Sequence, residues 1–246
     1  LVRKLGPARK KTEPLGEKHQ KIAAAMQRVF EETVTQILER LHARTGLDRL
    51  VVSGGCFMNS VYNGKISEQT PFKEVYIGSA PDDSGTAIGS GLWLHAQRTG
   101  TRSLEPVVHN YYGPEYSDAA CLEVARKFKI SSAEVVDDPS ARAAKDLVDG
   151  KIIGWFQGKM EFGQRALGNR SILLDPRRKD GKDVVNAAIK FREAFRPFAP
   201  AILLEKTHEW FECEPGTKVP FMERVLMFRP DKRDLVPAVV HVDGSG

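Results

Sequence analysis

The sequence lacks most of the features that would place it outside the ordinary globular proteins. It has three cysteines, Cys56, Cys121 and Cys213, which are widely spaced and odd in number. This argues against a disulfide framework and against a cysteine-based zinc site. No apolar run approaches the roughly 20 residues that span a bilayer, and no charged start with an apolar core marks a signal peptide. We therefore expect a reducing, cytoplasmic setting without membrane partners.

Other absences argue against a histidine metal site and against a cysteine nucleophile. The six histidines show no pairing at the spacing of metal ligands on a helix, so core or surface positions are expected for them. No cysteine has a neighbour that would mark it as a nucleophile. No internal repeat and no low-complexity tract is present. The three tryptophans, Trp93, Trp155 and Trp210, are most simply interpreted as core residues.

What is present is the composition of a globular chain, with 41% hydrophobic and 28% charged residues in a length of 246. That length suits one large domain or two small ones. The net charge of +5 fits nucleic-acid binding and small phosphorylated ligands equally well. The chain starts at Leu1 and ends on "HVDGSG", which favours a fragment of a longer protein.

The first region predicts alternating helices and strands after an extended segment, residues 1–16. Apolar residues recur at helical spacing over about 17–44, and "LDRLVVSGG" predicts a strand with Leu50, Val51 and Val52 buried. "CFMNSVYNGKISEQ" predicts a helix, "FKEVYIG" a second strand, and "DDSGTAIGSGLWLHAQR" a loop that opens into another helix. This order is typical of an α/β fold with ligand sites at the strand ends.

A linker over residues 99–116 leads to a second region of mixed order. Ser117 or Asp118 caps a helix that runs to about Lys129, and Asp138 caps another that runs to Asp149. Strands are expected in "KIIGWF", "SILL" and "FAPAILL", a short helix in "KDVVNAAIKF", and a helical turn in "THEWF". The long loops between these elements are typical of functional segments.

Two glycine turns follow the first two strands. Gly54, Gly55 and Asn59 lie in "SGGCFMN", where backbone amides and a helix N-terminus could approach an anion; a tight structural turn is the alternative. Asp82 and Asp83 lie in "APDDSGTAIG", as helix caps or as ligands of a hard cation. Two such turns at the same end of one sheet favour a nucleotide or metal cleft.

The second region carries two cationic stretches. "GKMEFGQRALGNRSILLDPRR" begins at residue 158, and "IKFREAFRPFAPAIL" contains Lys190, Arg192 and Arg196. Arginine forks and lysine ammonium groups are natural partners of phosphate. Aromatic residues lie between the charges, which favours a partly enclosed anion pocket over two solvated loops and also suits base stacking with single-stranded nucleic acid.

Together these motifs resemble the NodU/CmcH-type O-carbamoyltransferases, from about residue 14 to residue 246. "FGQRALGNRSI" and "KFREAFRPFAP" carry the most specific part of this resemblance, beside "VVSGGCFMNSVYNGKI" and "DDSGTAIG". The resemblance implies half of an actin-like (duplicated ATPase) domain over 1–98, the linker, and a truncated YrdC-like α+β domain over 117–246. It implies an enzyme that makes carbamoyl-adenylate from carbamoyl phosphate and ATP and transfers the carbamoyl group to a hydroxyl of a small molecule.

The resemblance also implies roles for individual residues. Those matched to activation of the carbamoyl group are Lys159, Arg165, Arg170 and Arg196 as catalytic residues, and Glu161, Asn169, Ser171, Lys190 and Arg192 as substrate- or nucleotide-binding residues. Gly54, Gly55 and Asn59 match a nucleotide-binding turn. Asp83 matches a ligand of a divalent metal, iron or magnesium, whose histidine ligands lie upstream in the family and have no counterpart here. A homodimer is compatible with it.

The resemblance therefore predicts an ATP-dependent O-carbamoyltransferase, with the transfer reaction incomplete in this chain alone. The alternative from another class is a basic YrdC-like module that binds RNA, which the motif register disfavours.

Overall fold

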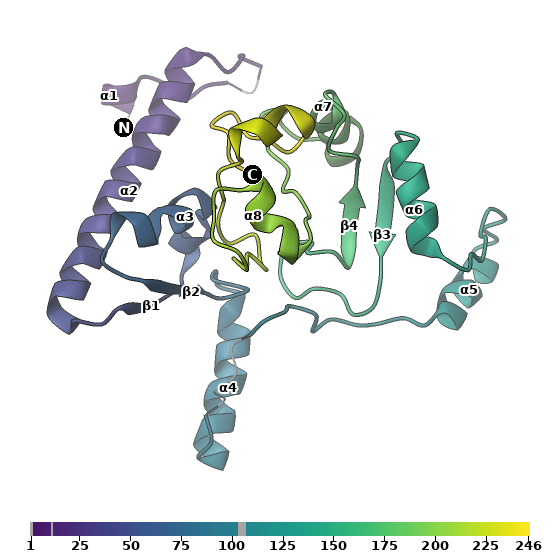
Figure 1. Ribbon diagram of the computed structural model, residues 1–246, viewed down its shortest axis with the longest axis horizontal. Helices are drawn as coiled ribbons and strands as arrows, with labels where there is room; N and C mark the ends of the chain where they lie inside the picture. Colours follow the sequence, from purple (N-terminus) through teal and green to yellow (C-terminus); the bar gives the residue numbers. More distant parts are fainter. Residues whose placement is uncertain (1, 11, 103–106) are drawn as a thin grey trace. The chain divides into compact units, whose positions relative to one another are not determined.

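The computed structural model describes residues 2–10, 12–102 and 107–246. Over these residues helices alternate with four short strands, which pair two by two into small sheets (Figure 1). β1 (Arg49–Val52) pairs with β2 (Glu74–Ile77), and β3 (Ile153–Phe156) pairs with β4 (Arg170–Leu173). The expected mixed α/β class is confirmed, whereas its actin-like and YrdC-like details stay predictions.

The helices agree closely with the sequence pattern. The α-helices are α1 (Val2–Leu5), α2 (Glu17–Thr45), α3 (Ser60–Gln69), α4 (Gly85–Thr99), α5 (Asp118–Lys127), α6 (Pro139–Val148), α7 (Gly181–Val185) and α8 (Thr207–Trp210). Short 3₁₀ helices cover Gly55–Met58, Leu204–Lys206 and Pro230–Leu235, and a π-helical segment, Asn186–Lys190, continues α7. Ser117 and Asp138 cap α5 and α6 as expected, each accepting a backbone N–H.

Two compact units are distinguished by their internal contacts. The first comprises Leu1–Leu50 and Lys65–Val75, and the second comprises Val51–Gly64 and Tyr76–Gly246. In the first unit Leu38, Ile66 and Phe72 are buried. In the second, a cluster around Phe211 and Phe228, whose ring centroids lie 4.2 Å apart, forms a buried core. Every residue of the site described below belongs to the second unit. The domain boundaries taken from the sequence stay predictions.

The β3–β4 hairpin positions the long cationic loop. The strands are antiparallel, with Ile153 opposite Leu173 and Phe156 opposite Arg170. Residues 157–169 therefore form the loop of this hairpin, and α6 packs against β3 (Figure 1). The Gln157 amide donates to the Asn169 carbonyl at 3.0 Å, which continues the pairing beyond the last strand residues. The loop is thus anchored at both ends by backbone hydrogen bonds.

Four expectations were wrong. Val51 is 73% exposed, because side chains alternate along a strand and only Leu50 and Val52 point inward. "FAPAILL" forms no strand; Pro200 within it and Pro197 just before it lack the N–H that a ladder needs. Residues 1–16 include the helical turn α1. Trp93 is 65% exposed and Trp155 is half-buried, whereas Trp210 is half-buried and packs against the Phe211–Phe228 cluster.

The cap of α6 provides a test of the local fold. Asp138→Ala removes the carboxylate oxygen that accepts the Ala141 N–H at 2.9 Å. We expect the free energy of unfolding, measured by urea denaturation, to fall by about 1 kcal/mol. Asp137→Ala removes the neighbouring exposed carboxylate and should leave stability nearly unchanged. Equal losses in the two variants would contradict a specific capping role.

Candidate functional site

The tips of the two glycine turns meet. The Ser53 hydroxyl and the Gly54 amide both donate to the Pro81 carbonyl, at 3.4 and 2.5 Å. Gly54 has φ +104°, a conformation that L side chains rarely adopt, so this turn requires glycine. The expectation that the two turns lie together is therefore confirmed.

Much of the polar character of the turns serves the local fold. The Asn59 side-chain oxygen accepts the Tyr62 N–H at 3.1 Å and so caps α3, while Gly55 begins a 3₁₀ helix. The Asp82 carboxylate accepts the Ser84 hydroxyl at 2.6 Å. Nucleotide binding by Gly54, Gly55 and Asn59 stays a prediction.

Asp83 was expected to bind a metal. Its carboxylate is exposed at the start of α4, and its carbonyl accepts the Thr86 N–H. Within the described part of the chain, no group of three or more His, Cys, Asp or Glu side chains could hold a metal ion. Residues described here therefore do not form a metal site by themselves, and the role of Asp83 stays a prediction.

A buried carboxylate organises the hairpin loop. The Glu161 side chain is fully buried, and its Oε1 accepts the amides of Leu167 and Asn169 at 2.6 and 2.7 Å. Its Oε2 accepts the Arg170 Nε at 3.2 Å. Burial raises the pKa of the Glu161 carboxyl, but the hydrogen bonds and the Arg170 charge outweigh it and hold that pKa below its usual value. Glu161 is thus a positioning residue: its carboxylate is ionised, and both of its oxygens accept hydrogen bonds from the loop around it.

Asn169, Arg170 and Ser171 also bond within the loop. The Asn169 side-chain amide donates to the Lys159 carbonyl at 2.7 Å. The Arg170 guanidinium donates to the carbonyls of Gly163 and Arg165, and the Ser171 hydroxyl accepts the Gly168 N–H at 3.1 Å. Lys159 and Arg165, by contrast, are exposed. Of the predicted residues in this loop, these two cations are the ones presented to solvent.

The segment interpreted as a linker binds this loop. The Asn110 side-chain NH₂ donates to the Phe162 carbonyl, and the Asn110 backbone carbonyl accepts the Phe162 N–H. The Gly113 amide donates to the Met160 carbonyl at 2.9 Å, and the Tyr111 hydroxyl donates to the Leu167 carbonyl at 3.4 Å. Asn110 is 2% exposed. This role was not predicted from the sequence, although Asn110 stands in the aromatic-rich stretch "HNYYGPEY".

The second cationic stretch is organised by Asn186, which is 1% exposed. Its amide donates to the carbonyls of Ala194 and Arg196, and its oxygen accepts the Arg192 Nε at 2.7 Å. The Arg192 guanidinium also lies 4.7 Å from the centroid of the Phe198 ring. Burial and the charge of Arg196 lower the pKa of Arg192. Lys190 and Arg196 are exposed, and Arg196 pairs with a neighbouring glutamate, Glu193, at 3.0 Å.

The two cationic stretches do not bond to each other. Within the described ranges, no hydrogen bond or ion pair joins residues 157–171 to residues 186–198. Figure 1 places α7, which leads into the second stretch, at the opposite end of the β3–β4 hairpin from the loop. A single anion site made by both stretches therefore stays a prediction.

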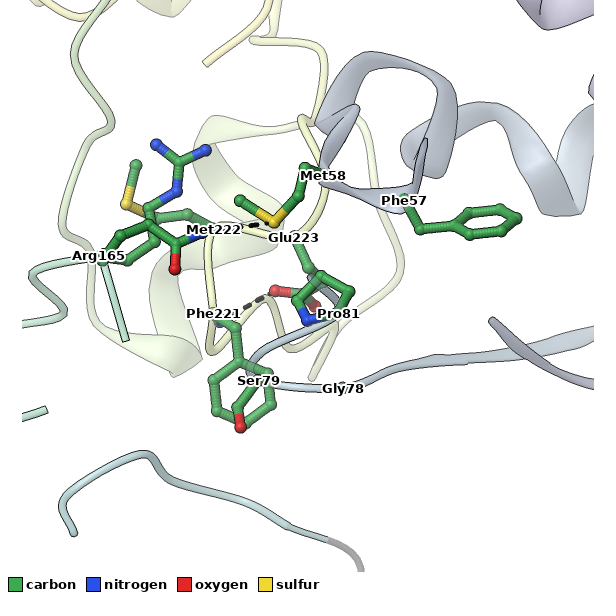
Figure 2. A pocket seen from close by; sticks show the side chains of 10 residues that line it. Phe57, Met58, Gly78, Ser79, Pro81, Arg165, Phe221, Met222 and Glu223 are labelled. Atoms are coloured by element: carbon green, nitrogen blue, oxygen red, sulfur yellow. Dashed lines mark hydrogen bonds between the residues drawn. The ribbon is translucent and has the colours of Figure 1, made fainter. Parts of the chain in front are cut away.

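A pocket brings Arg165 to the glycine turns. Ten residues line it: Phe57, Met58, Gly78, Ser79, Pro81, Gln164, Arg165, Phe221, Met222 and Glu223 (Figure 2). The space it encloses is small, about 290 Å³ even when the open solvent at its mouth is counted. The Gln164 side-chain amide contacts the Met58 sulfur at 3.4 Å, which joins the hairpin loop to the first turn.

The far wall of the pocket contains a buried carboxyl. Glu223 is 8% exposed, and burial raises the pKa of its carboxyl above the usual value, an effect that its hydrogen bonds and the Arg224 charge offset only in part. Sequence reasoning missed this residue; the available signal was one acidic residue inside the apolar run "VPFMERVLMF".

The comparisons with known proteins agree with this arrangement. Residues 5–92 match the family model described as "Carbamoyltransferase N-terminus", and residues 144–246 match "Carbamoyltransferase C-terminus". The pocket thus contains residues from both matched regions. The chain belongs to the carbamoyltransferase family.

Relatives extend the match over nearly the whole chain. It is 38% identical over 241 residues to "Nodulation protein NolNO" of Sinorhizobium fredii, covering 96% of this chain and 35% of the relative. It is 35% identical over 252 residues to "Nodulation protein NolO" of Bradyrhizobium diazoefficiens, covering 98% of this chain and 46% of the relative. The chain therefore spans less than half the length of these relatives. In its described part, no helix is long and apolar enough to cross a membrane.

The Glu161 network makes a pH-dependent prediction. Glu161→Gln removes the negative charge that holds Arg170, and should lower the free energy of unfolding at pH 7 by about 1.5–3 kcal/mol. Because the folded-state pKa is lowered, this contribution is fully present above the ordinary value of 4.5 and is lost as pH falls through the folded-state value. The stability curves of wild type and variant should therefore converge in acid.

The matched control for this prediction is Glu193→Gln, which breaks an exposed ion pair and should change stability little. Chemical denaturation at several pH values measures both variants. A constant gap between wild type and Glu161→Gln down to strong acid would contradict an ionised Glu161.

Proposed function

We propose that the protein is an ATP-dependent O-carbamoyltransferase, and that the pocket around Arg165 belongs to the site where the carbamoyl group is activated. The observation that carries the proposal is the position of Arg165. An exposed guanidinium is held on a loop fixed by Glu161, and it lines a pocket with both glycine turns. A fixed arginine fork is suited to a phosphate group.

The proposed reaction has three steps. Carbamoyl phosphate loses phosphate to water and leaves carbamate. A carbamate oxygen then attacks the α-phosphorus of ATP, which forms carbamoyl-adenylate and releases pyrophosphate. Finally a hydroxyl of the acceptor attacks the carbamoyl carbon, its proton is lost to a base, and AMP leaves. The products are the carbamate ester, AMP, pyrophosphate and phosphate.

The residues of this chain supply charge and rigidity to these steps. We assign the neutralisation of phosphate oxygens to Arg165 and Lys159. Both are exposed, and Glu161, Asn169 and Arg170 hold the loop on which they stand. Lys190 and Arg196 are further cations for the ATP phosphates. Positive groups fixed before the reaction stabilise the charge that develops as pyrophosphate leaves.

The finer parts of the proposal follow from family resemblance. They are an actin-like transfer region, a YrdC-like activation region, and an acceptor that is a hydroxyl-bearing small molecule. A divalent metal would act through ligands that the described residues do not complete, so no step is assigned to it.

Binding measurements test the proposal. Calorimetric titration of the protein with carbamoyl phosphate, alone and with ATP, should detect binding. Arg165→Ala should weaken the binding of carbamoyl phosphate by about 10- to 100-fold, because a charge-assisted hydrogen bond to phosphate is lost. Arg196→Ala should weaken the binding of ATP.

Arg126→Ala on α5 is the control, since it removes an exposed guanidinium far along the chain from both cationic stretches. It should leave both affinities unchanged. Unaltered binding in Arg165→Ala and Arg196→Ala would overturn the proposed site. Salt-sensitive binding of RNA without any affinity for carbamoyl phosphate would replace it with a nucleic-acid function.

A further inference from the structure

The proposed reaction assigns no role to Glu223, although this residue lines the same pocket as Arg165. Its side chain is 6% exposed. It follows Met222, which has φ +54°, an uncommon conformation for a residue other than glycine. A buried carboxyl presented by a strained backbone in a pocket wall points to a ligand rather than to solvent.

The carboxyl group keeps capacity to accept further hydrogen bonds. Its Oε2 accepts the Phe221 N–H at 2.9 Å, and its Oε1 forms an ion pair with Arg224, whose Nε lies 3.6 Å away, beyond ordinary hydrogen-bond length. A carboxylate can accept about four hydrogen bonds. Figure 2 shows Phe221, Met222 and Glu223 on one wall of the pocket, with Met58 and Pro81 from the glycine turns beside them.

The backbone beneath Glu223 is fixed to the first glycine turn. The buried Asn63 side-chain amide donates to the carbonyls of Glu223 and Phe57, both at 2.7 Å. The Val225 amide donates to the Ser60 carbonyl at 3.2 Å, and a Cβ at Gly64 would lie 2.6 Å from the Val225 oxygen. This close packing holds the carboxyl in place before any ligand arrives.

The pocket therefore offers one cation, one buried carboxyl, and apolar walls from Phe57, Phe221 and Met222. The enclosed space is too small for a whole nucleotide. A ligand that these groups recognise needs an anionic end for Arg165 and an N–H donor for Glu223. Within the proposed function, carbamoyl phosphate has both, because a phosphate and an amino group flank its carbonyl carbon.

We propose that Glu223 determines the specificity for the carbamoyl group, by accepting a hydrogen bond from its amino group while Arg165 binds the phosphate. This inference rests on the proposed function. Acetyl phosphate is nearly the same shape but carries a methyl group in place of the amino group. The methyl group would offer no donor to the remaining acceptor position of the buried carboxyl, and sites built to bind an N–H reject analogues that lack it.

The raised pKa of Glu223 agrees with this geometry. Burial makes the charged carboxylate unfavourable, and a hydrogen-bond donor on the ligand would offset part of that cost. The neutral carboxyl also keeps a carbonyl oxygen that accepts an N–H, so the selection holds in either protonation state.

The experiment compares three probes, carbamoyl phosphate, acetyl phosphate and inorganic phosphate, by calorimetric titration of the wild-type protein and two variants. Glu223→Leu removes both acceptor oxygens. Glu223→Gln keeps an oxygen for the Phe221 N–H and turns an NH₂ donor toward the carbamoyl amino group. Thermal melting establishes that each variant is folded. Glu123→Leu, at an exposed position on α5, is the control.

We expect wild type and Glu123→Leu to prefer carbamoyl phosphate over acetyl phosphate, and both Glu223 variants to lose about 10- to 100-fold of that preference. The affinity for inorganic phosphate should stay unchanged. If a folded Glu223→Gln keeps the preference, or if all three probes weaken equally, the inference is overturned while the proposed function stands. If the wild type binds no carbamoyl phosphate, the proposed function fails as well.

Discussion

The candidate site depends on one buried ion, the Glu161 carboxylate. The loop of the β3–β4 hairpin contains three glycines, and none of its apolar side chains is fully buried. Glu161 replaces a hydrophobic core for this segment: two backbone amides and the Arg170 guanidinium converge on its two oxygens. A buried carboxylate without such donors would be strongly unfavourable, so the loop is held in the one conformation that supplies them. The exposed Arg165 takes its position from that conformation.

The same arrangement joins regions that are distant in the sequence. The residue 99–116 segment bonds to the hairpin loop through Asn110 and Gly113, and the loop reaches the first glycine turn through Gln164 and Met58. Asn63 ties that turn to the wall that carries Glu223. Side-chain amides form several of these contacts because one NH₂ group can donate hydrogen bonds to two carbonyls at once. The result is a small pocket whose walls are each fixed by hydrogen bonds to another wall.

The sequence predicted the elements better than it predicted how side chains are used. Helical periodicity and capping residues located α2, α5 and α6, because those signals are local. The cationic character of the loop was also visible. The sequence could not show which charged groups turn inward. Arg170 and Arg192 are arginines in the same kind of cationic stretch as Arg165, yet both bond to their own loops. The roles of Asn63, Asn110 and Asn186 depend on contacts between distant segments, which leave no periodic pattern.

The central claim is that the protein activates carbamoyl phosphate with ATP, and isotope exchange between ATP and labelled pyrophosphate tests it most directly. The account predicts that label enters ATP when carbamoyl phosphate is present, and that this exchange stops when carbamoyl phosphate is omitted. Exchange without carbamoyl phosphate, or no exchange by a folded protein that has carbamoyl phosphate and ATP bound, would contradict the formation of carbamoyl-adenylate.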